Sequence, residues 1–373
     1  MTHSASNILI FSPAFRPLIG GSELALEALM RHMPGRSFVV LTPRYSTAFP
    51  ARESHENVRI RRIGFGVPWL DKYLFLVFGA TIGLREARHA AVLHAYQASY
   101  AALAALVVRF FSRVPLIVTL QEGAHFQKQS LLVRAGRWLA VRYADRVTAI
   151  SSPLEIYARH VRRGVGVTLV PNGVDPAHTC TSEERSRLRT AWGIRADEVC
   201  IYSASRLVSK NGIDALVRAC AALSFPWRLV VAGAGERARM LQQLAVELGV
   251  SDRVVWRGSV SHGEVLKELG AIDVYARPSR SEGQGIAFLE AMAAGVPVVA
   301  SRRGGLRDFM RDGETGFVCD PDDIPSIVDA LTRASRPGAE RDTVVTTAGD
   351  MISREYLWSL IAPRMAAVYD TLA

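Results

Sequence analysis

Strand-like and helix-like segments alternate along this chain, and the whole alternation occurs twice. In the first half, apolar runs such as NILIFSP, VPLIVTLQEG and ADRVTAIS end in polar residues and are separated by helical stretches. After VTLVPNGVDP, where Asn-Gly and Asp-Pro pairs predict turns, the alternation begins again with VCIYSAS. This pattern predicts parallel, doubly wound α/β sheets, in which ligands bind beyond the carboxyl ends of the strands.

The length and composition favour an ordered protein of two domains. A chain of 373 residues is longer than one typical core, and 49% hydrophobic with 21% charged residues is ordinary for a globular protein. We predict domains at residues 1–172 and 173–350, followed by a final segment, residues 351–373. The four cysteines form no Cys-x-x-Cys pair, and the first residues resemble no signal peptide, so we expect reduced thiols in a cytoplasmic protein.

The charge is unevenly distributed. Residues 1–175 hold 21 Lys and Arg against 10 Asp and Glu, although the net charge of the whole chain is only +10. A basic first half indicates an anionic partner. Because no basic block is interleaved with aromatic residues, we expect no nucleic acid; an anionic membrane surface or a phosphate-bearing acceptor fits better.

The most apolar segment is VPWLDKYLFLVFGATIGLREARH. Its uninterrupted part, Tyr73 to Leu84, is far shorter than the roughly 20 residues that span a bilayer. Two interpretations stay open. The segment is either a helix packed in the core, or a helix that rests on a membrane with its aromatic residues inserted and its basic neighbours at the lipid headgroups.

The stretch PSRSEGQGIAFLEAMAAGVP predicts a ligand site. It places Glu282 and Glu290 with seven residues between them, and Gly283, Gln284 and Gly285 lead into a helical run. Glycines let backbone N–H groups approach a ligand closely, and the beginning of a helix suits a phosphate. Glu290 falls in the early turns of this helix, where its carboxylate can accept hydrogen bonds from sugar or ribose hydroxyls.

A phosphate at this helix needs opposite charge. Arg206 and Lys210 follow the first strand of the second domain, at the edge of the sheet where the Glu282 loop also lies. The Asp-Pro-Asp sequence at residues 320–322 is explained by helix capping, so we predict a site without a metal.

Glycines also mark the first strand-loop-helix junction. Gly20 and Gly21 follow NILIFSP and precede SELALEALMRHM, a helix that we expect Ser22 to cap. Phosphates and sugars often bind at such junctions.

Five sequence segments together resemble one known family: VPNGVD, SRLVSKNG, AGAGERARML, PSRSEGQGIAFLEAMAAGVPVVAS and GGLRDFMRDGETGF. They are similar to the retaining glycosyltransferases of family four. The resemblance covers nearly the whole chain and implies the GT-B architecture, two Rossmann-like domains that face each other across a cleft. It also implies that the last helix crosses back onto the first domain.

The resemblance assigns roles to individual residues. Arg206 and Lys210 match residues that hold the diphosphate of a nucleotide-diphosphate-sugar donor, which is a substrate; no cofactor is implied. Glu290 matches the carboxylate that binds the ribose, and Glu282 the one that faces the donor sugar. The remaining matches to donor binding are Gly20 and Gly21, Gly283 to Gly285, and the stretch Trp256 to Val260 near the base, which includes Arg257.

Two departures from the family pattern concern the active site. Gln121 and Glu122 stand where many members have a histidine, so the usual active-site histidine is absent or displaced, with His94 or His125 as candidates to replace it. The usual Glu-Gly-Phe-Gly is Glu-Gly-Gln-Gly here, which puts the Gln284 amide where an aromatic ring normally packs.

We therefore expect a metal-independent, retaining glycosyltransferase, cytoplasmic or peripheral on the inner face of the membrane. Its acceptor would be a glycan, a lipid-linked sugar or another hydroxyl compound in bacterial cell-surface polysaccharide or glycolipid synthesis. The alternative is a nucleotide-sugar-binding protein with weak catalysis. A dehydrogenase is disfavoured because the Gly-x-Gly-x-x-Ala at Gly233 lacks the acidic residue at the end of the following strand. The base, the sugar, the acceptor and the oligomeric state stay open.

Overall fold

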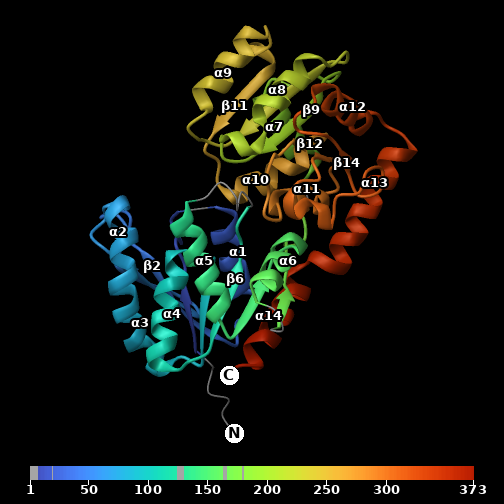
Figure 1. Ribbon diagram of the computed structural model, residues 1–373. Helices are drawn as coiled ribbons and strands as arrows, with labels where there is room; N and C mark the ends of the chain where they lie inside the picture. The colour runs from blue at the N-terminus through green and yellow to red at the C-terminus, as the bar shows by residue number, and fades with distance from the viewer. Residues whose placement is uncertain (1–6, 19, 124–129, 163–165, 179) are drawn as a thin grey trace. The chain divides into compact units, whose positions relative to one another are not determined.

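Two β-sheets, each covered by helices on both faces, organise the chain in the computed structural model (Figure 1). The structure describes residues 7–18, 20–123, 130–162, 166–178 and 180–373. Contacts divide the chain into unit 1, Met1–Gly173 with Trp358–Ala373, and unit 2, Val174–Leu357. Both units are α/β, which confirms the predicted fold class.

Unit 1 contains an eight-stranded sheet of order β3-β4-β2-β1-β5-β6-β7-β8. Only the β3–β4 pair is antiparallel. The sheet reverses its direction of growth between β1 and β5, which makes their carboxyl ends a natural ligand position. The strands are β1 Asn7–Phe11, β2 Ser37–Pro43, β3 Arg52–His55, β4 Val58–Ile63, β5 Val92–Tyr96, β6 Leu116–Leu120, β7 Arg146–Ala149 and β8 Val167–Leu169.

Helices cover both faces of this sheet because its strands are apolar on both sides. Leu9 and Phe11 face a core shared with η1, α3, α4, α5 and α6. The other face carries α1 and the last helix, α14, which contact each other. The helices are α1 Gly21–Arg31, α2 Pro68–Leu74, η1 Phe75–Gly79, α3 Ala80–Glu86, η2 Ala87–His89, α4 Tyr100–Ser112, α5 Leu131–Tyr143, α6 Ser152–Val161 and α14 Trp358–Asp370.

Unit 2 contains a six-stranded, fully parallel sheet of order β11-β10-β9-β12-β13-β14. Its direction of growth reverses between β9 and β12, so this unit also has a switch point. The strands are β9 Val199–Ala204, β10 Trp227–Ala232, β11 Val254–Gly258, β12 Val274–Arg277, β13 Val298–Ala300 and β14 Phe317–Val318.

The helices of unit 2 also form two layers. Leu216 of α8, Leu241 of α9 and Ile327 of α12 pack on one face of the sheet, while Phe288 of α11 packs on the other. The helices are α7 Ser182–Ala191, η4 Ser209–Asn211, α8 Ile213–Ala221, α9 Ala238–Glu247, η5 Ser251–Arg253, α10 His262–Glu268, η6 Leu269–Ala271, α11 Ile286–Ala293, η7 Gly304–Asp308, α12 Ile324–Ser335, α13 Ala339–Met351 and η8 Ile352–Tyr356.

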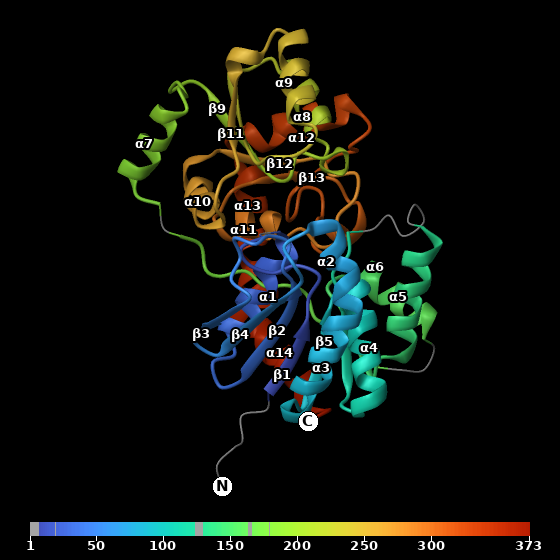
Figure 2. The same ribbon diagram turned by 90° about the vertical axis from the view of Figure 1, so that its left-hand side faces the viewer.

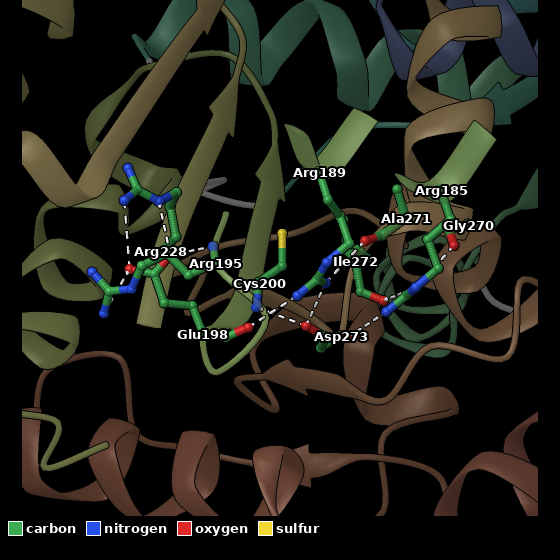
Figure 3. Close-up of polar contacts among 10 residues, drawn as sticks. All are labelled: Arg185, Arg189, Arg195, Glu198, Cys200, Arg228, Gly270, Ala271, Ile272 and Asp273. Carbon is green, nitrogen blue, oxygen red and sulfur yellow. Dashed lines mark hydrogen bonds and ion pairs between the residues drawn. The ribbon is translucent and has the colours of Figure 1, made fainter. Parts of the chain in front are cut away.

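Helix α7 has no fully buried residue, and it is attached to unit 2 through the partly buried Leu188 and through ion pairs. Arg185 lies 2.6 Å from one carboxylate oxygen of Asp273, and Arg189 lies 2.8 Å from the other (Figure 3). The same carboxylate accepts the Cys200 backbone N–H at 2.8 Å. Asp273 directly precedes β12 and Cys200 is in β9, so this network joins α7 to the amino end of the sheet.

Replacing Asp273 tests how much this network stabilises unit 2. We expect Asp273→Asn to lower the free energy of unfolding by about 1.5–3 kcal/mol, since two guanidinium groups lose a charged partner. Urea unfolding measures the loss. Asp197→Asn is the matched control, because Asp197 pairs with the exposed Arg195 at the surface and its loss should leave the free energy of unfolding nearly unchanged. Equal losses in the two variants would contradict the stabilising role of the network.

Candidate functional site

The switch point of unit 2 brings two predicted segments together. The loop after β9 carries Arg206 and Lys210, and the loop after β12 carries Glu282. The backbone N–H of Arg280 donates to the carbonyl of Lys210 at 2.7 Å. A Cβ on Gly212, at φ +70°, would lie 1.9 Å from the Pro278 carbonyl oxygen, so only glycine permits this approach of the two loops.

Positive charge is uncompensated at this edge of the sheet. Arg206 is exposed, and within the described residues neither its guanidinium nor the Lys210 ammonium makes an ion pair with a carboxylate. Burial lowers the pKa of Lys210, and the nearby Glu282 carboxylate partly offsets this effect. These two cations are therefore available to an anionic ligand.

Glu282 is held by an arginine that the sequence analysis did not select. The Arg277 guanidinium lies 2.6 Å from one oxygen of the Glu282 carboxylate, and the other oxygen accepts the Gly283 N–H at 3.1 Å. The Glu282 backbone is fixed as well: Gly305 donates to its carbonyl at 3.1 Å. The carboxylate is thus oriented before any ligand arrives.

Arg277 is almost completely buried, with 6% of its surface exposed. It donates to the Ala204 carbonyl and the Ser279 hydroxyl, and its guanidinium lies 4.2 Å from the centre of the Phe288 ring. Because the Glu282 carboxylate is paired with Arg277, neither Lys210 nor Arg206 has an ion-pair partner among the described residues, although Glu282 still raises the pKa of Lys210. One indication of the role of Arg277 was present in the sequence: an arginine stands at the end of the apolar strand IDVYARPS.

Helix α11 begins at the same edge. Its N-cap is Gly285, at φ +94°, and no side chain caps the first turn. Gly283 and Gln284 are buried in the turn before it. The unpaired N–H groups and the positive end of the helix dipole make this position favourable for a phosphate group.

Glu290 lies on α11 after its first turn. One carboxylate oxygen of Glu290 is 2.6 Å from Nε2 of His262, at the start of α10, and only 9% of the Glu290 side chain is exposed. His262 is a second contact that the sequence analysis missed, because nothing local shows that α10 packs beside α11. The imidazole fixes the direction of the carboxylate.

Arg257, at the carboxyl end of β11, belongs to an internal network. Its guanidinium lies 2.9 Å from the buried carboxylate of Glu268, which also accepts the hydroxyl of Tyr202 at 2.6 Å. About a third of the Arg257 side chain, 35%, is exposed. The contact with a nucleotide base remains a prediction.

In unit 1 the glycine pair lies at the start of α1. Gly20 is the N-cap and Gly21 the first helical residue, so the prediction that Ser22 caps this helix is wrong. The Ser22 hydroxyl accepts from the Gln97 amide at 2.8 Å instead. A Cβ on Gly21 would meet no atom within 4 Å, so packing does not require glycine there.

His94 does not fit a catalytic role. It is completely buried in β5, with its ring nitrogens 2.8 Å from the Tyr369 hydroxyl and 2.6 Å from the Thr119 hydroxyl. Burial lowers the pKa of His94 to about 3. The prediction that it replaces an active-site histidine is therefore corrected: His94 joins α14 to the sheet. His125, the other candidate, lies outside the described residues.

Gln121 and Glu122 are also engaged within unit 1. The side-chain amides of Gln121 and Asn172 bond to each other reciprocally at 2.9 and 3.1 Å. The Glu122 carboxylate accepts the backbone N–H groups of Ala98 and Gln121, and burial raises its pKa. These contacts fix the loop after β6.

In the part of the chain that the structure describes, no group of three or more His, Cys, Asp or Glu side chains could hold a metal ion.

Two family models match the chain. Residues 184–348 match the model described as glycosyl transferases group 1, and residues 19–178 match the model described as glycosyltransferase family 4. Together they cover parts of both units.

Individual proteins are similar over long stretches. An uncharacterised glycosyltransferase of Methanocaldococcus jannaschii is 31% identical over 255 residues, 66% of this chain and 65% of that protein. The GDP-mannose-dependent alpha-(1-6)-phosphatidylinositol monomannoside mannosyltransferase of Mycobacterium tuberculosis is 32% identical over 241 residues, 60% of each. The alignments thus span less than two thirds of these relatives. The structure of Anabaena HepE with UDP and glucose superimposes with a TM-score of 0.83 at 20% identity, covering 98% of this chain and 100% of that one.

The burial of His94 leads to a pH-dependent prediction. Between pH 6.5 and pH 3 the unfolded chain binds a proton at this residue that the folded protein does not, so acid lowers stability. Between pH 7 and pH 5 we expect the free energy of unfolding to fall by about 2 kcal/mol because of His94. The variant His94→Gln should not show this part of the fall. Urea unfolding at both pH values measures it. Identical acid sensitivity of wild type and variant would contradict a buried, neutral His94.

Proposed function

Because the chain belongs to family 4 of the glycosyltransferases and has the GT-B fold, we propose that it transfers a sugar from a nucleotide-diphosphate-sugar to a hydroxyl acceptor, with retention of the anomeric configuration. The observation that carries this proposal is the pair of uncompensated cations, Arg206 and Lys210, beside the uncapped start of α11. A diphosphate would bring negative charge to these two cations and acceptor oxygens to the unpaired N–H groups of α11.

We assign the other residues of the site to parts of the donor. Glu290, oriented by His262, would accept hydrogen bonds from the ribose hydroxyls. Glu282, oriented by Arg277, would face the transferred sugar. The backbone from Gly283 to Gly285 would approach the phosphate and sugar, and Gly20 and Gly21 remain predicted donor-binding residues of unit 1.

The proposed reaction requires stabilisation of a leaving group. The bond between the anomeric carbon and the diphosphate oxygen breaks, and the acceptor oxygen bonds to that carbon on the same face. The acceptor proton passes to the leaving phosphate oxygen. Arg206, Lys210 and the N–H groups of α11 would stabilise the charge that develops on the diphosphate, so we propose that no metal is needed.

A lipid-linked or glycan acceptor fits the basic charge of unit 1. The Mycobacterium tuberculosis relative is named for transfer to a phosphatidylinositol mannoside, which is a lipid. We propose a role in cell-surface glycolipid or polysaccharide synthesis, in the cytoplasm or at the inner face of the membrane. The relative is named for GDP-mannose whereas the Anabaena structure holds UDP, so we assign neither base nor sugar.

The paired amide of Gln121 favours a second candidate function, binding of a nucleotide sugar without turnover. Gln121 stands where many family members have a histidine, and its bonds to Asn172 leave it no obvious catalytic role. Release of the nucleoside diphosphate from UDP-glucose and GDP-mannose, with and without a lipid extract as acceptor, separates the two functions. A pure binding protein releases none.

Removing either cation should weaken diphosphate binding. We expect Arg206→Ala and Lys210→Ala to raise the Kd of the preferred nucleoside diphosphate about 10- to 100-fold, as loss of a charged hydrogen bond does. Thermal shifts with UDP, GDP, ADP, CMP and dTDP, with and without magnesium, identify that ligand first. Arg218→Ala, an exposed arginine near the end of α8, is the matched control and should bind like wild type. Unchanged affinity in both site variants would refute the diphosphate assignment.

Arg277 should act by neutralising Glu282. In Arg277→Met the freed carboxylate would pair with Lys210, whose pKa it already raises, so the Kd of the diphosphate should rise about tenfold. The double variant Arg277→Met with Glu282→Gln removes the competing charge and should recover most of the affinity, which calorimetry measures. A double variant as weak as the single one would contradict the charge argument.

A further inference from the structure

Exposed hydrophobic side chains are concentrated in unit 1. Among the described residues, 16 of the 21 large hydrophobic side chains that are exposed belong to residues 65–78, 107–111 and 131–143. Single exposed hydrophobic residues are ordinary, but such a concentration marks an interaction surface. The members are Phe65, Val67, Trp69, Tyr73, Leu76, Val77, Phe78, Val107, Phe110, Phe111, Leu131, Leu132, Val133, Trp138, Leu139 and Tyr143.

Fourteen of these residues lie on one layer of helices, and Phe65 and Val67 lie in the loop that leads into α2. Helix α4 contacts η1, α3 and α5, and these helices cover the same face of the sheet (Figures 1 and 2). The sides that face the sheet are buried through residues such as Phe75, Ala105 and Ala140. The exposed side chains therefore lie on the outer side of the layer, which we call the outer helix face.

The segment from α2 to η1 is apolar on both sides. Trp69, Tyr73 and Val77 recur every fourth residue and are 67%, 64% and 62% exposed, respectively. On the opposite side, Phe75 is completely buried. A helix that is hydrophobic all round is normally buried or in contact with lipid. Core packing, the first interpretation that the sequence left open, thus applies to the side of Phe75, while the exposed side remains open to the second interpretation, contact with a membrane.

The outer helix face is also basic. Its helices and their ends carry Lys72, Arg85, Arg88, Arg109, Arg113, Arg134 and Arg142. The carboxylates of these helices bind other groups. Asp71 is buried and accepts the backbone N–H groups of Phe65 and Gly66, and Glu86 pairs with Arg61. Asp145, after α5, pairs with Arg109. Positive charge therefore remains around the aromatic residues.

A cavity adjoins this face and has the same chemistry. Its volume is about 320 Å³, and it opens between β4 and the α2–α3 segment. Phe65 and Phe78 line it together with Arg52, Arg61 and Arg62. Arg61 pairs with Glu86 and Arg62 with Glu53, so the cavity adds its apolar lining and the Arg52 guanidinium to this face.

We propose that the outer helix face docks on an anionic lipid bilayer. Tryptophan and tyrosine favour the boundary between headgroups and acyl chains, and arginine and lysine are attracted to anionic headgroups. A second copy of the chain fits less well, because in a symmetric dimer this basic face would meet itself. Among the described residues no helix has both the length and the apolarity to cross a bilayer. The proposal rests on the proposed function, since it keeps the enzyme beside a lipid-borne acceptor.

Sedimentation with vesicles tests the docking surface. We expect the whole protein to bind vesicles that contain phosphatidylglycerol, more tightly at low salt, and to leave pure phosphatidylcholine unbound. Trp69→Ser with Tyr73→Ser should weaken this binding about tenfold or more. The matched control, Met240→Ser with Val246→Ser, removes two exposed apolar side chains from α9 in unit 2 and should bind as wild type does.

Three outcomes would overturn the proposal: no binding of wild type to anionic vesicles at low salt, equal binding by both double variants, or a dimer in light scattering that the Trp69 and Tyr73 changes dissociate. The thermal shift with the preferred nucleoside diphosphate, measured without vesicles, is independent of lipid. It should be unchanged in both double variants, which also shows that they fold. If wild type binds the diphosphate normally but does not bind anionic vesicles, the docking surface alone is refuted, whereas absence of diphosphate binding in wild type refutes the proposed function.

Discussion

The ion pair between Arg277 and Glu282 determines the charge of the whole site in unit 2. Without it, the Glu282 carboxylate would be free to pair with Lys210, and Arg206 would be the one cation of the two left without a carboxylate partner in the described part of the chain. The buried guanidinium satisfies the carboxylate and is itself held by the Ala204 carbonyl and the Phe288 ring. The desolvated Lys210 and the exposed Arg206 are then left to attract an anion, and the burial of Lys210 has a cost in stability that the surrounding sheet must offset.

Close backbone contact makes this charge arrangement possible. Gly212 lets the loop after β9 touch the loop after β12, and a Cβ on Gly304 would lie 2.0 Å from the Glu282 carbonyl oxygen. Both glycines adopt positive φ. The side chains that matter are thus placed by main-chain packing, which is more rigid than packing between flexible side chains. The direction of Glu290 depends similarly on its neighbour in space, His262.

The fold and the predicted position of the site in unit 2 were accessible from the sequence because both depend on local patterns. Apolar runs identify strands, and polar residues just after them identify the carboxyl edge. The predictions that failed depend on contacts between residues far apart in the sequence. His94 follows the same local rule, but α14, which is 275 residues away, covers it through Tyr369. Arg277 and His262 were missed for the same reason, since their partners are set by tertiary packing. At α1 the error was local: Ser22 is a better capping residue than glycine, yet its hydroxyl bonds to Gln97.

The position of α14 has a consequence for biosynthesis. This helix follows unit 2 in the chain but belongs to unit 1, where Trp358 stacks on His32 and Asp370 pairs with Arg36. During translation, therefore, all of unit 2 leaves the ribosome before unit 1 can be completed. Until then the side of the first sheet that carries His94 lacks its last covering helix, and a nascent chain exposes apolar strand surface there for the time needed to synthesise an entire domain.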